Sequence, residues 1–303
     1  MKKEKERKAP PPLLFDSDLS KERCPARGAR GVDHTESKEP YYTLTEVVIR
    51  LPEAAERLGR PIGKYKTLQF DDTAFFLREA RETVKKALVT LLREALPRTP
   101  LRLLVVGLGN RRLAIDSIGP KTAESVTATA VWNHLSHEHK QAWSAISVFC
   151  PDVYRVTGME AANLVKAAVR LTQADAVLAV DAMATARPSH LLRAIELTDT
   201  GTVPGAGIGD HRLPLSRETL GVPVIALGIP TMMRARPHLR RALIDFGVER
   251  SQADSYAKRE KDLLLIPAAL EDGIAALCEL TACAINTAFG VEGTIDQKKG
   301  DLL

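Results

Sequence analysis

The sequence predicts an α/β protein: a three-layer sandwich in which a mainly parallel sheet lies between helices, with a small antiparallel β addition. Apolar runs without polar alternation, such as LRLLVVGL at 101–108 and AVLAVDA at 176–182, are typical of strands buried on both faces. Segments with apolar residues at helical spacing separate these runs, and this alternation is typical of parallel sheets. With 303 residues and 45% hydrophobic content, the chain is long enough to bury a sizeable core.

The first residues differ in composition from the rest. Residues 1–14 are charged and then proline-rich, which predicts a mobile tail, so the single α/β domain is expected over 15–303. Residues 15–40 are rich in Gly, Lys, Glu and Asp. The β-branched and aromatic segments YYTLTEVVIR (41–50) and YKTLQF (65–70) predict two short strands, which form the antiparallel addition.

The remaining elements follow in order. Apolar residues recur at helical spacing over 72–96, and Pro97 ends that helix. The expected strands of the core are 101–108, 145–150, 176–182, 193–199 and 222–230, and the expected helices are 120 to about 137, 159–171, 237–246 and 262–289.

Charge and cysteine content exclude several function classes. A net charge of +5 on 43 basic and 38 acidic residues gives little support to a nucleic-acid groove. The four cysteines form no CxxC pair, which is typical of a reduced compartment. Because no signal-peptide core and no run of about 18 uncharged apolar residues is present, we expect a cytoplasmic protein without a membrane partner.

The glycine turn after the first core strand is open to two interpretations. Gly107 and Gly109 resemble the start of a dinucleotide-binding turn, but Arg112 stands where that motif has its third glycine. Asp116 follows closely, and its charge would repel a phosphate. A nucleotide-binding α/β module therefore remains only an alternative.

Two aspartates form the stronger candidate site. Asp116 lies in the loop after 101–108 and Asp181 closes the strand AVLAVD, so both are expected at the carboxyl edge of the sheet, where ligands bind in such folds. The structural alternative is that each aspartate caps the helix that follows it.

Repulsion between two carboxylates a few Å apart raises the pKa of one of them, which leaves one group as a base toward water and the other as an acid toward a leaving amine. Peptide hydrolysis requires that division of roles. The pair therefore indicates a hydrolase.

The segment TDTGTVPGAGIGDHR (198–212) is a third candidate feature. Its glycines allow close approach to a substrate backbone or movement as a lid, although an ordinary turn-rich loop has the same composition. Its Asp199, Asp210 and His211 match no metal motif, and we expect neither metal nor cofactor. The candidate substrate-binding residues are Asn110, Asp199, Gly201, Gly205, Gly207 and Gly209.

At these same residues the chain resembles the germination proteases, the spore endopeptidases of spore-forming bacteria. The resemblance covers roughly residues 100–232. The last helix, ending INTAFG, and GKYKTLQF also resemble family segments. The blocks that carry it, in family order, are VVGLGNRRLAIDSIGP, ISVFCPDVYRVTGMEAANLVKAAV, DAVLAVDAMATARPS, IELTDTGTVPGAGIGDHR and LSRETLGVPVIALGIPT.

The resemblance implies an atypical aspartic endopeptidase that digests small acid-soluble spore proteins at germination, cutting at a short motif containing glutamate. It implies a fold like that of hydrogenase maturation peptidases, a homotetramer in the spore core, and synthesis as a zymogen. Residues 1–14 are then the candidate propeptide. The family's two essential aspartates fall on Asp116 within IDSIGP and Asp181 within VDAMATA.

The chain departs from the family pattern in three places. The family's mature start resembles Arg-Thr-Asp-Leu-Ala-x-Glu, whereas residues 16–22 read DSDLSKE, which puts processing of the tail in doubt. The region between Thr231 and the last helix is shorter than the resemblance leads us to expect, and Arg234 replaces an acidic residue. A noncatalytic binding protein on the same fold is therefore a second alternative.

Overall fold

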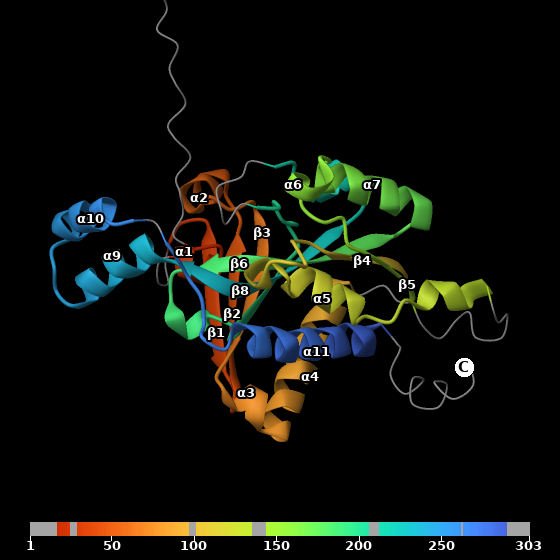
Figure 1. Ribbon diagram of the computed structural model, residues 1–303, viewed down its shortest axis with the longest axis horizontal. Helices are drawn as coiled ribbons and strands as arrows, with labels where there is room; N and C mark the ends of the chain where they lie inside the picture. The colour runs from red at the N-terminus through yellow and green to blue at the C-terminus, as the bar shows by residue number, and fades with distance from the viewer. Residues whose placement is uncertain are drawn as a thin grey trace, which may run out of the picture.

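The computed structural model describes residues 17–24, 29–96, 101–134, 144–205, 212–261 and 263–289, and the expected tail at 1–14 lies outside these ranges. Their strands form one sheet in the order β1-β2-β3-β7-β8-β6-β4-β5, with β9 paired to β8 (Figure 1). The strands are β1 (Val32–Lys38), β2 (Tyr42–Ile49), β3 (Gly63–Phe70), β4 (Arg102–Gly107), β5 (Ala145–Phe149), β6 (Ala176–Thr185), β7 (Ala194–Thr198), β8 (Val224–Arg234) and β9 (Leu264–Leu265).

The sheet has a parallel half and an antiparallel half. Strands β5, β4, β6 and β8 are parallel, as the apolar runs predict. Strands β1, β2, β3 and β7 continue from β8 with antiparallel pairing throughout. We expected a mainly parallel sheet with a small antiparallel addition, but the antiparallel part contains as many of these strands as the parallel part. The segment 193–199 pairs antiparallel to both its neighbours and joins the two halves, because its chain direction is set by tertiary pairing that local composition does not encode.

Helices cover both faces of the sheet (Figure 1). The α-helices are α1 (Ser20–Arg23), α2 (Pro52–Leu58), α3 (Thr73–Phe76), α4 (Arg78–Ala95), α5 (Ile118–Glu124), α6 (Tyr154–Thr157), α7 (Ala161–Thr172), α8 (Arg217–Leu220), α9 (Ala235–Asp245), α10 (Arg250–Arg259) and α11 (Leu270–Ala288). The described residues also form the 3-10 turns η1 (Ala114–Asp116), η2 (Thr129–His134) and η3 (Pro188–His190).

Two separate cores show why the molecule has three layers. Alternate residues of β4 point to opposite faces: Leu103 and Val105 belong to the core with α4, α5 and α11, whereas Leu104 and Val106 belong to the core with α7 and α8. Strands that are apolar at every position can therefore be buried on both sides. The α/β class predicted from the apolar runs is confirmed.

The helix expected from Pro120 to about His137 is wrong. Helix α5 ends at Glu124, and the chain then crosses to the edge strand. The Thr129 hydroxyl donates to the Ser144 carbonyl at 2.7 Å and accepts from the Ile146 N–H at 2.9 Å. These tertiary hydrogen bonds fix Thr129 against the edge strand β5, where it is no part of a continuing α-helix.

Other boundaries also differ. Leu77, with φ −101° and ψ 119°, separates α3 from α4 within the helix expected over 72–96. Helix α11 begins at Leu270 because the preceding residues pair as β9 with the end of β8. The sequence reading assigned no element to β1, α2 or α10. No helix among the described residues is long and apolar enough to cross a membrane.

Candidate active site

Asp116 and Asp181 lie at the carboxyl edge of the parallel half, as expected. Asp116 ends η1 in the loop after β4. Strand β6 does not close at Asp181, as its apolar run predicted, but continues to Thr185 beside β8. The ladder between β4 and β6 ends at the pair Gly107 and Val180. Asp181 is therefore the first residue of β6 that β4 leaves uncovered, which opens its carboxyl group to a cavity.

The glycine turn after β4 encloses Asp116. The Asn110 N–H donates to Asp116 Oδ2 at 2.7 Å. Gly109 has φ +113°, and a Cβ at this position would lie 2.2 Å from the Asp116 carbonyl oxygen. Glycine is thus required because the backbone conformation and the close approach both exclude a side chain. The turn uses its N–H on a carboxylate of the chain itself, in the place where a dinucleotide-binding turn would hold a phosphate.

Neither aspartate caps a helix. The residue before α5 is Ser117, and no side chain caps that helix. Asp181 lies within a strand, where its Oδ1 accepts from the Ala182 N–H at 2.9 Å. The capping alternative was therefore wrong for both residues, because it assumed that a helix follows each aspartate directly.

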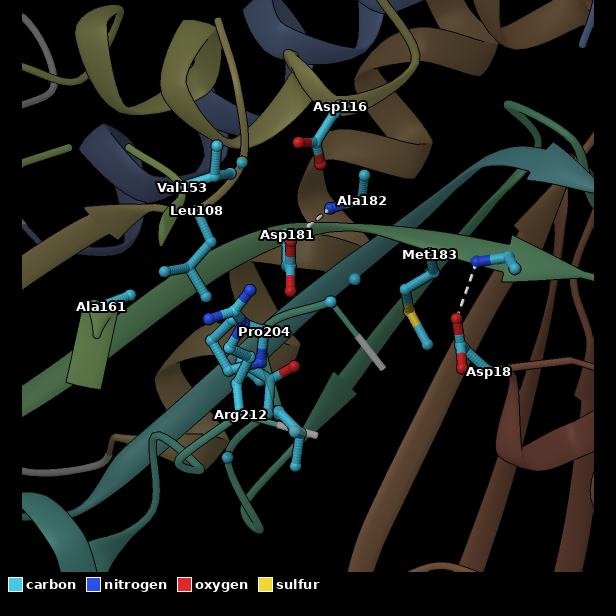
Figure 2. A pocket seen from close by; sticks show the side chains of 18 of the residues that line it. Asp18, Leu108, Asp116, Val153, Ala161, Asp181, Ala182, Met183, Pro204 and Arg212 are labelled. Atoms are coloured by element: carbon cyan, nitrogen blue, oxygen red, sulfur yellow. Dashed lines mark hydrogen bonds between the residues drawn. The ribbon is translucent and has the colours of Figure 1, made fainter. Parts of the chain in front are cut away.

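Both carboxyl groups face one cavity of about 510 Å³ (Figure 2). The lining comes from the loops after β4 and β5, from the N-terminal segment and from the residues that follow α2. Gly201 and Gly205 line it from the segment after β7. Figure 2 shows Asp116 and Asp181 at the cavity wall together with Pro204 and Arg212.

The two carboxyl groups have raised pKa values. Burial raises the pKa of Asp181 well above its usual range, and the charges of Asp116 and Asp18 raise it further against the opposing Ala182 N–H and Thr202 hydroxyl. Burial also raises the pKa of Asp116, and the charge of Asp152 adds to this, but the Asn110 N–H opposes it. Asp181 thus holds its proton more firmly, while a backbone donor stabilises the ionised form of Asp116.

The other expected site residues divide into three groups. The backbone of Asn110 binds Asp116, and Gly201 and Gly205 lie at the cavity. Asp199 is not among the cavity residues, since its Oδ1 accepts from the Lys64 N–H of β3 at 2.8 Å. Gly207, Gly209, Asp210 and His211 lie outside the described residues. In the described part of the chain, no group of three or more His, Cys, Asp or Glu side chains is placed to hold a metal ion.

Sequence reasoning missed the contribution of the N-terminal segment. Asp18 pairs with β6 through two hydrogen bonds: its N–H donates to the Ala184 carbonyl at 2.8 Å, and its Oδ2 accepts from the Ala184 N–H at 2.9 Å. Leu19 is completely buried. Ser20 donates from its N–H to Glu196 Oε2 of β7 at 2.8 Å. The only signal was the partial match of DSDLSKE to the family start, because no local pattern shows that residues 17–24 reach a strand more than 150 positions later.

A second anchor holds this segment next to the site. The Glu22 carboxylate accepts from the Thr185 hydroxyl at 2.6 Å and the Ala186 N–H at 2.7 Å, and it contacts His190 Nδ1. Burial opposes ionisation of Glu22, but these hydrogen bonds, that of His190 foremost, lower its pKa overall. The segment 17–24 is therefore an integral part of the cavity wall.

Comparison with known proteins shows which family the chain resembles. A family model described as "Germination protease" matches residues 14–273. A germination protease of Clostridium tetani is 33% identical over 207 residues, covering 68% of this chain and 64% of that protein. One of Caldanaerobacter subterraneus is also 33% identical, again over 64% of its length. One of Clostridium perfringens is 30% identical over 278 residues, or 81% of this chain and 84% of that protein.

The first two of these matches thus span less than two thirds of the relatives' length. Among solved structures, a [NiFe] hydrogenase maturation protease from Thermococcus kodakarensis matches with a TM-score of 0.35 at 16% identity, over 65% of this chain and 99% of that one. With the family model matching most of the sequence, the chain belongs to the germination protease family.

Proposed function

We propose that this chain is an endopeptidase that hydrolyses small acid-soluble spore proteins during germination, with Asp116 and Asp181 as its general base and general acid. One observation carries the proposal: two carboxyl groups face the same cavity, and the pKa of one is raised far more than that of the other. Unequal carboxyl groups of this kind are suited to acid and base roles in one reaction.

The environments of the two groups support the assignment of roles. Asp116, ionised and held by the Asn110 N–H, accepts a proton from a water molecule as the water oxygen bonds to the scissile carbonyl carbon. Asp181, protonated, donates its proton to the amide nitrogen as the carbon–nitrogen bond breaks. Asp116 gains one proton from the water and Asp181 loses one to the leaving amine, so the two carboxyl groups together hold one proton before and after the reaction. Gly201 and Gly205 allow the substrate backbone to approach this pair closely.

The proposal extends to the cellular setting. The family resemblance supports a cytoplasmic location in the spore core, a homotetramer, and a zymogen in which residues 1–14 are the propeptide. The described residues begin at Ser17, and the next residue, Asp18, lines the cavity that holds the two aspartates. That placement is compatible with regulation of the site by the tail.

Incubation with a purified small acid-soluble spore protein tests the proposal. Wild type is compared with Asp116→Asn and Asp181→Asn, and both the substrate and the N-terminus of the chain are followed by mass spectrometry. We expect discrete cuts by wild type and losses of at least about 1,000-fold in each variant, because each removes an acid or base step. Full activity in either folded variant would refute the assignment.

The same experiment separates the alternatives. Cuts that appear only after removal of the first residues indicate a zymogen. Stable binding of the spore protein without cleavage by either form favours the noncatalytic binding protein, and saturable nucleotide binding, measured by calorimetry, favours the nucleotide-binding module.

A further inference from the structure

The end of the cavity nearest α2 carries two arginines of unusual burial. Gly59, with φ +60°, ends α2 in the left-handed conformation, and this C-terminal turn directs the next residue, Arg60, toward the cavity. The Arg60 side chain is 18% exposed and that of Arg23 is 11% exposed. A peptide bound across the aspartate pair therefore has a cationic subsite within reach.

The two arginines differ in how their hydrogen bonds are used. Arg23 donates from Nε to the Ser17 carbonyl at 2.5 Å and from Nη1 to the Leu58 and Gly59 carbonyls, and its Nη2 lies 3.5 Å from Asp18. Burial and the charge of Arg60 lower the pKa of Arg23 to about 10, so it remains a cation at neutral pH. Arg23 therefore serves to fix the N-terminal segment and adds positive charge.

Arg60 has donor capacity left over. Its Nη2 donates to Glu196 Oε1 at 3.2 Å, and its guanidinium lies 5.5 Å from the centre of the Tyr65 ring. Its Nε is buried, and no hydrogen-bond acceptor for it exists among the described residues. Guanidinium groups present five N–H donors, and of the four on the two Nη atoms only one is used within the described part of the chain, by Glu196. A carboxylate in the cavity can accept from the remaining Nη donors.

Glu196 does not saturate Arg60. This carboxylate, 1% exposed, also accepts from the Ser20 N–H, the Ser20 hydroxyl and the Thr67 hydroxyl. With three donors besides Arg60, Glu196 is held in place by the fold and uses a single N–H of the guanidinium. The arrangement positions Arg60 by an ion pair while leaving its remaining donors for a ligand.

The position of Arg60 along the cavity indicates which substrate residue it meets. Figure 2 shows Met183 between Asp181 and Asp18. Arg23 links Asp18 to the residues that follow α2, because its Nη2 lies 3.5 Å from Asp18 and its Nη1 donates at 3.0 Å to the carbonyl of Gly59, the neighbour of Arg60. Two residues along a strand span about 7 Å. A side chain one to three residues from the scissile bond of an extended peptide can therefore reach this end.

Two other arginines that line the cavity, Arg155 and Arg212, are weaker candidates. Arg212 forms an ion pair with Glu160 at 3.3 Å and stacks 4.2 Å from the Tyr154 ring centre, so its orientation is fixed by the fold. Arg155 is exposed, where solvent and salt screen its charge. Arg60 is buried enough to discriminate between a charged and a neutral side chain.

We propose that Arg60, positioned by Glu196 and Tyr65, is a specificity-determining residue that binds an acidic side chain of the substrate, glutamate or aspartate, one to three residues from the scissile bond. This inference rests on the proposed endopeptidase function. It adds to that function the residue that selects the sequence.

Substrate series with matched enzyme variants test it. The probe is a synthetic peptide spanning a cut that mass spectrometry identifies in a small acid-soluble spore protein, made with its nearest acidic residue intact, as the amide, and as lysine. The variants are Arg60→Gln and Arg60→Lys. Arg57→Gln serves as the control, because it removes the same charge three residues earlier, within α2, where Arg57 is exposed and contacts the Arg30 carbonyl outside the cavity.

We expect wild type to prefer the acidic peptide over its amide by about 10- to 100-fold in kcat/KM, the factor typical of a hydrogen bond to a charged group. In Arg60→Gln the ratio should fall to within about threefold, and in Arg60→Lys it should be intermediate, since lysine keeps the charge and loses the planar fork. Arg57→Gln should keep the wild-type ratio. A merely structural role of Arg60 would lower kcat/KM for all three peptides equally.

The outcomes distinguish this inference from the function on which it rests. Cleavage by wild type without preference for the acidic peptide, or an unchanged preference in Arg60→Gln, overturns the subsite and leaves the peptidase standing. Absence of any cleavage by wild type or its N-terminally shortened form refutes both. If Arg60→Gln fails to fold, the wild-type series and Arg60→Lys still decide the matter.

Discussion

Replacing Gly109 by alanine tests whether the glycine turn exists to hold Asp116. The added Cβ would lie 2.2 Å from the Asp116 carbonyl oxygen and 2.8 Å from its Oδ1, and the residue would keep φ near +113°. The backbone conformation costs about 1 to 2 kcal/mol for a residue other than glycine. Overpacking against the backbone adds about 1 to 3 kcal/mol. We therefore expect Gly109→Ala to lower the free energy of unfolding by about 2 to 5 kcal/mol.

The same clash should displace Asp116, the proposed general base. Any shift that relieves it moves the Asp116 carboxylate or breaks its hydrogen bond with the Asn110 N–H, and a misplacement of about 1 Å can reduce turnover by about 100-fold. Urea unfolding followed by circular dichroism measures the first effect, and kcat on a spore-protein substrate measures the second.

Gly247→Ala is the matched control. Gly247 has φ +94°, but a Cβ there would meet no heavy atom within 4 Å. This variant should lose about 1 to 2 kcal/mol and keep wild-type kcat. If Gly109→Ala and Gly247→Ala behave alike in both measurements, the turn has no special role at Asp116 and the reasoning is refuted.

Two further predictions concern the N-terminal segment. Because the charge of Asp18 helps to raise the pKa of Asp181, Asp18→Asn should lower that pKa and move the alkaline limb of kcat/KM to lower pH; an unchanged limb would contradict the coupling. Glu22→Gln should lower the free energy of unfolding by about 3 kcal/mol at neutral pH, since it breaks a buried pair with His190. Since the folded pKa of Glu22 lies below the unfolded value, its contribution is present above the unfolded pKa and disappears as pH falls through the folded one, so the two proteins should converge in urea titrations at acidic pH. A difference that persists there would exclude the pair as its source.

Elements with strong periodicity were predictable, and those without it were not. Helix α4 and strands β4, β6 and β8 bury whole stripes or both faces, so their apolar residues recur with the period of the element. Strand β1 buries only its first residue, Val32, and its remaining positions are polar and mostly exposed. Pairing with β2 holds that strand in place, so composition carried no sign of it.

The site was predictable in part for the same reason. Asp116 and Asp181 follow apolar strands in the sequence, and parallel strands bring such positions to one edge. The strand register explains why Asp181 faces the cavity. The last pair between β4 and β6 is Gly107 with Val180, so β4 ends one residue before Asp181 while β6 continues. The capping alternative could not be rejected until that register was known.

The sequence by itself determined the α/β class, the position of the two aspartates at the ends of apolar runs, and the blocks that resemble the family. These features depend on local apolar periodicity and on residue order. The tertiary structure decided which side chains complete the cavity. Asp18, Arg60 and Glu196 come from an N-terminal segment, the end of a short helix and an antiparallel strand, and they meet only because β3 pairs with β7 and residues 17–24 dock on β6. Contacts between residues so distant in the chain depend on strand order and direction, which no local pattern encodes.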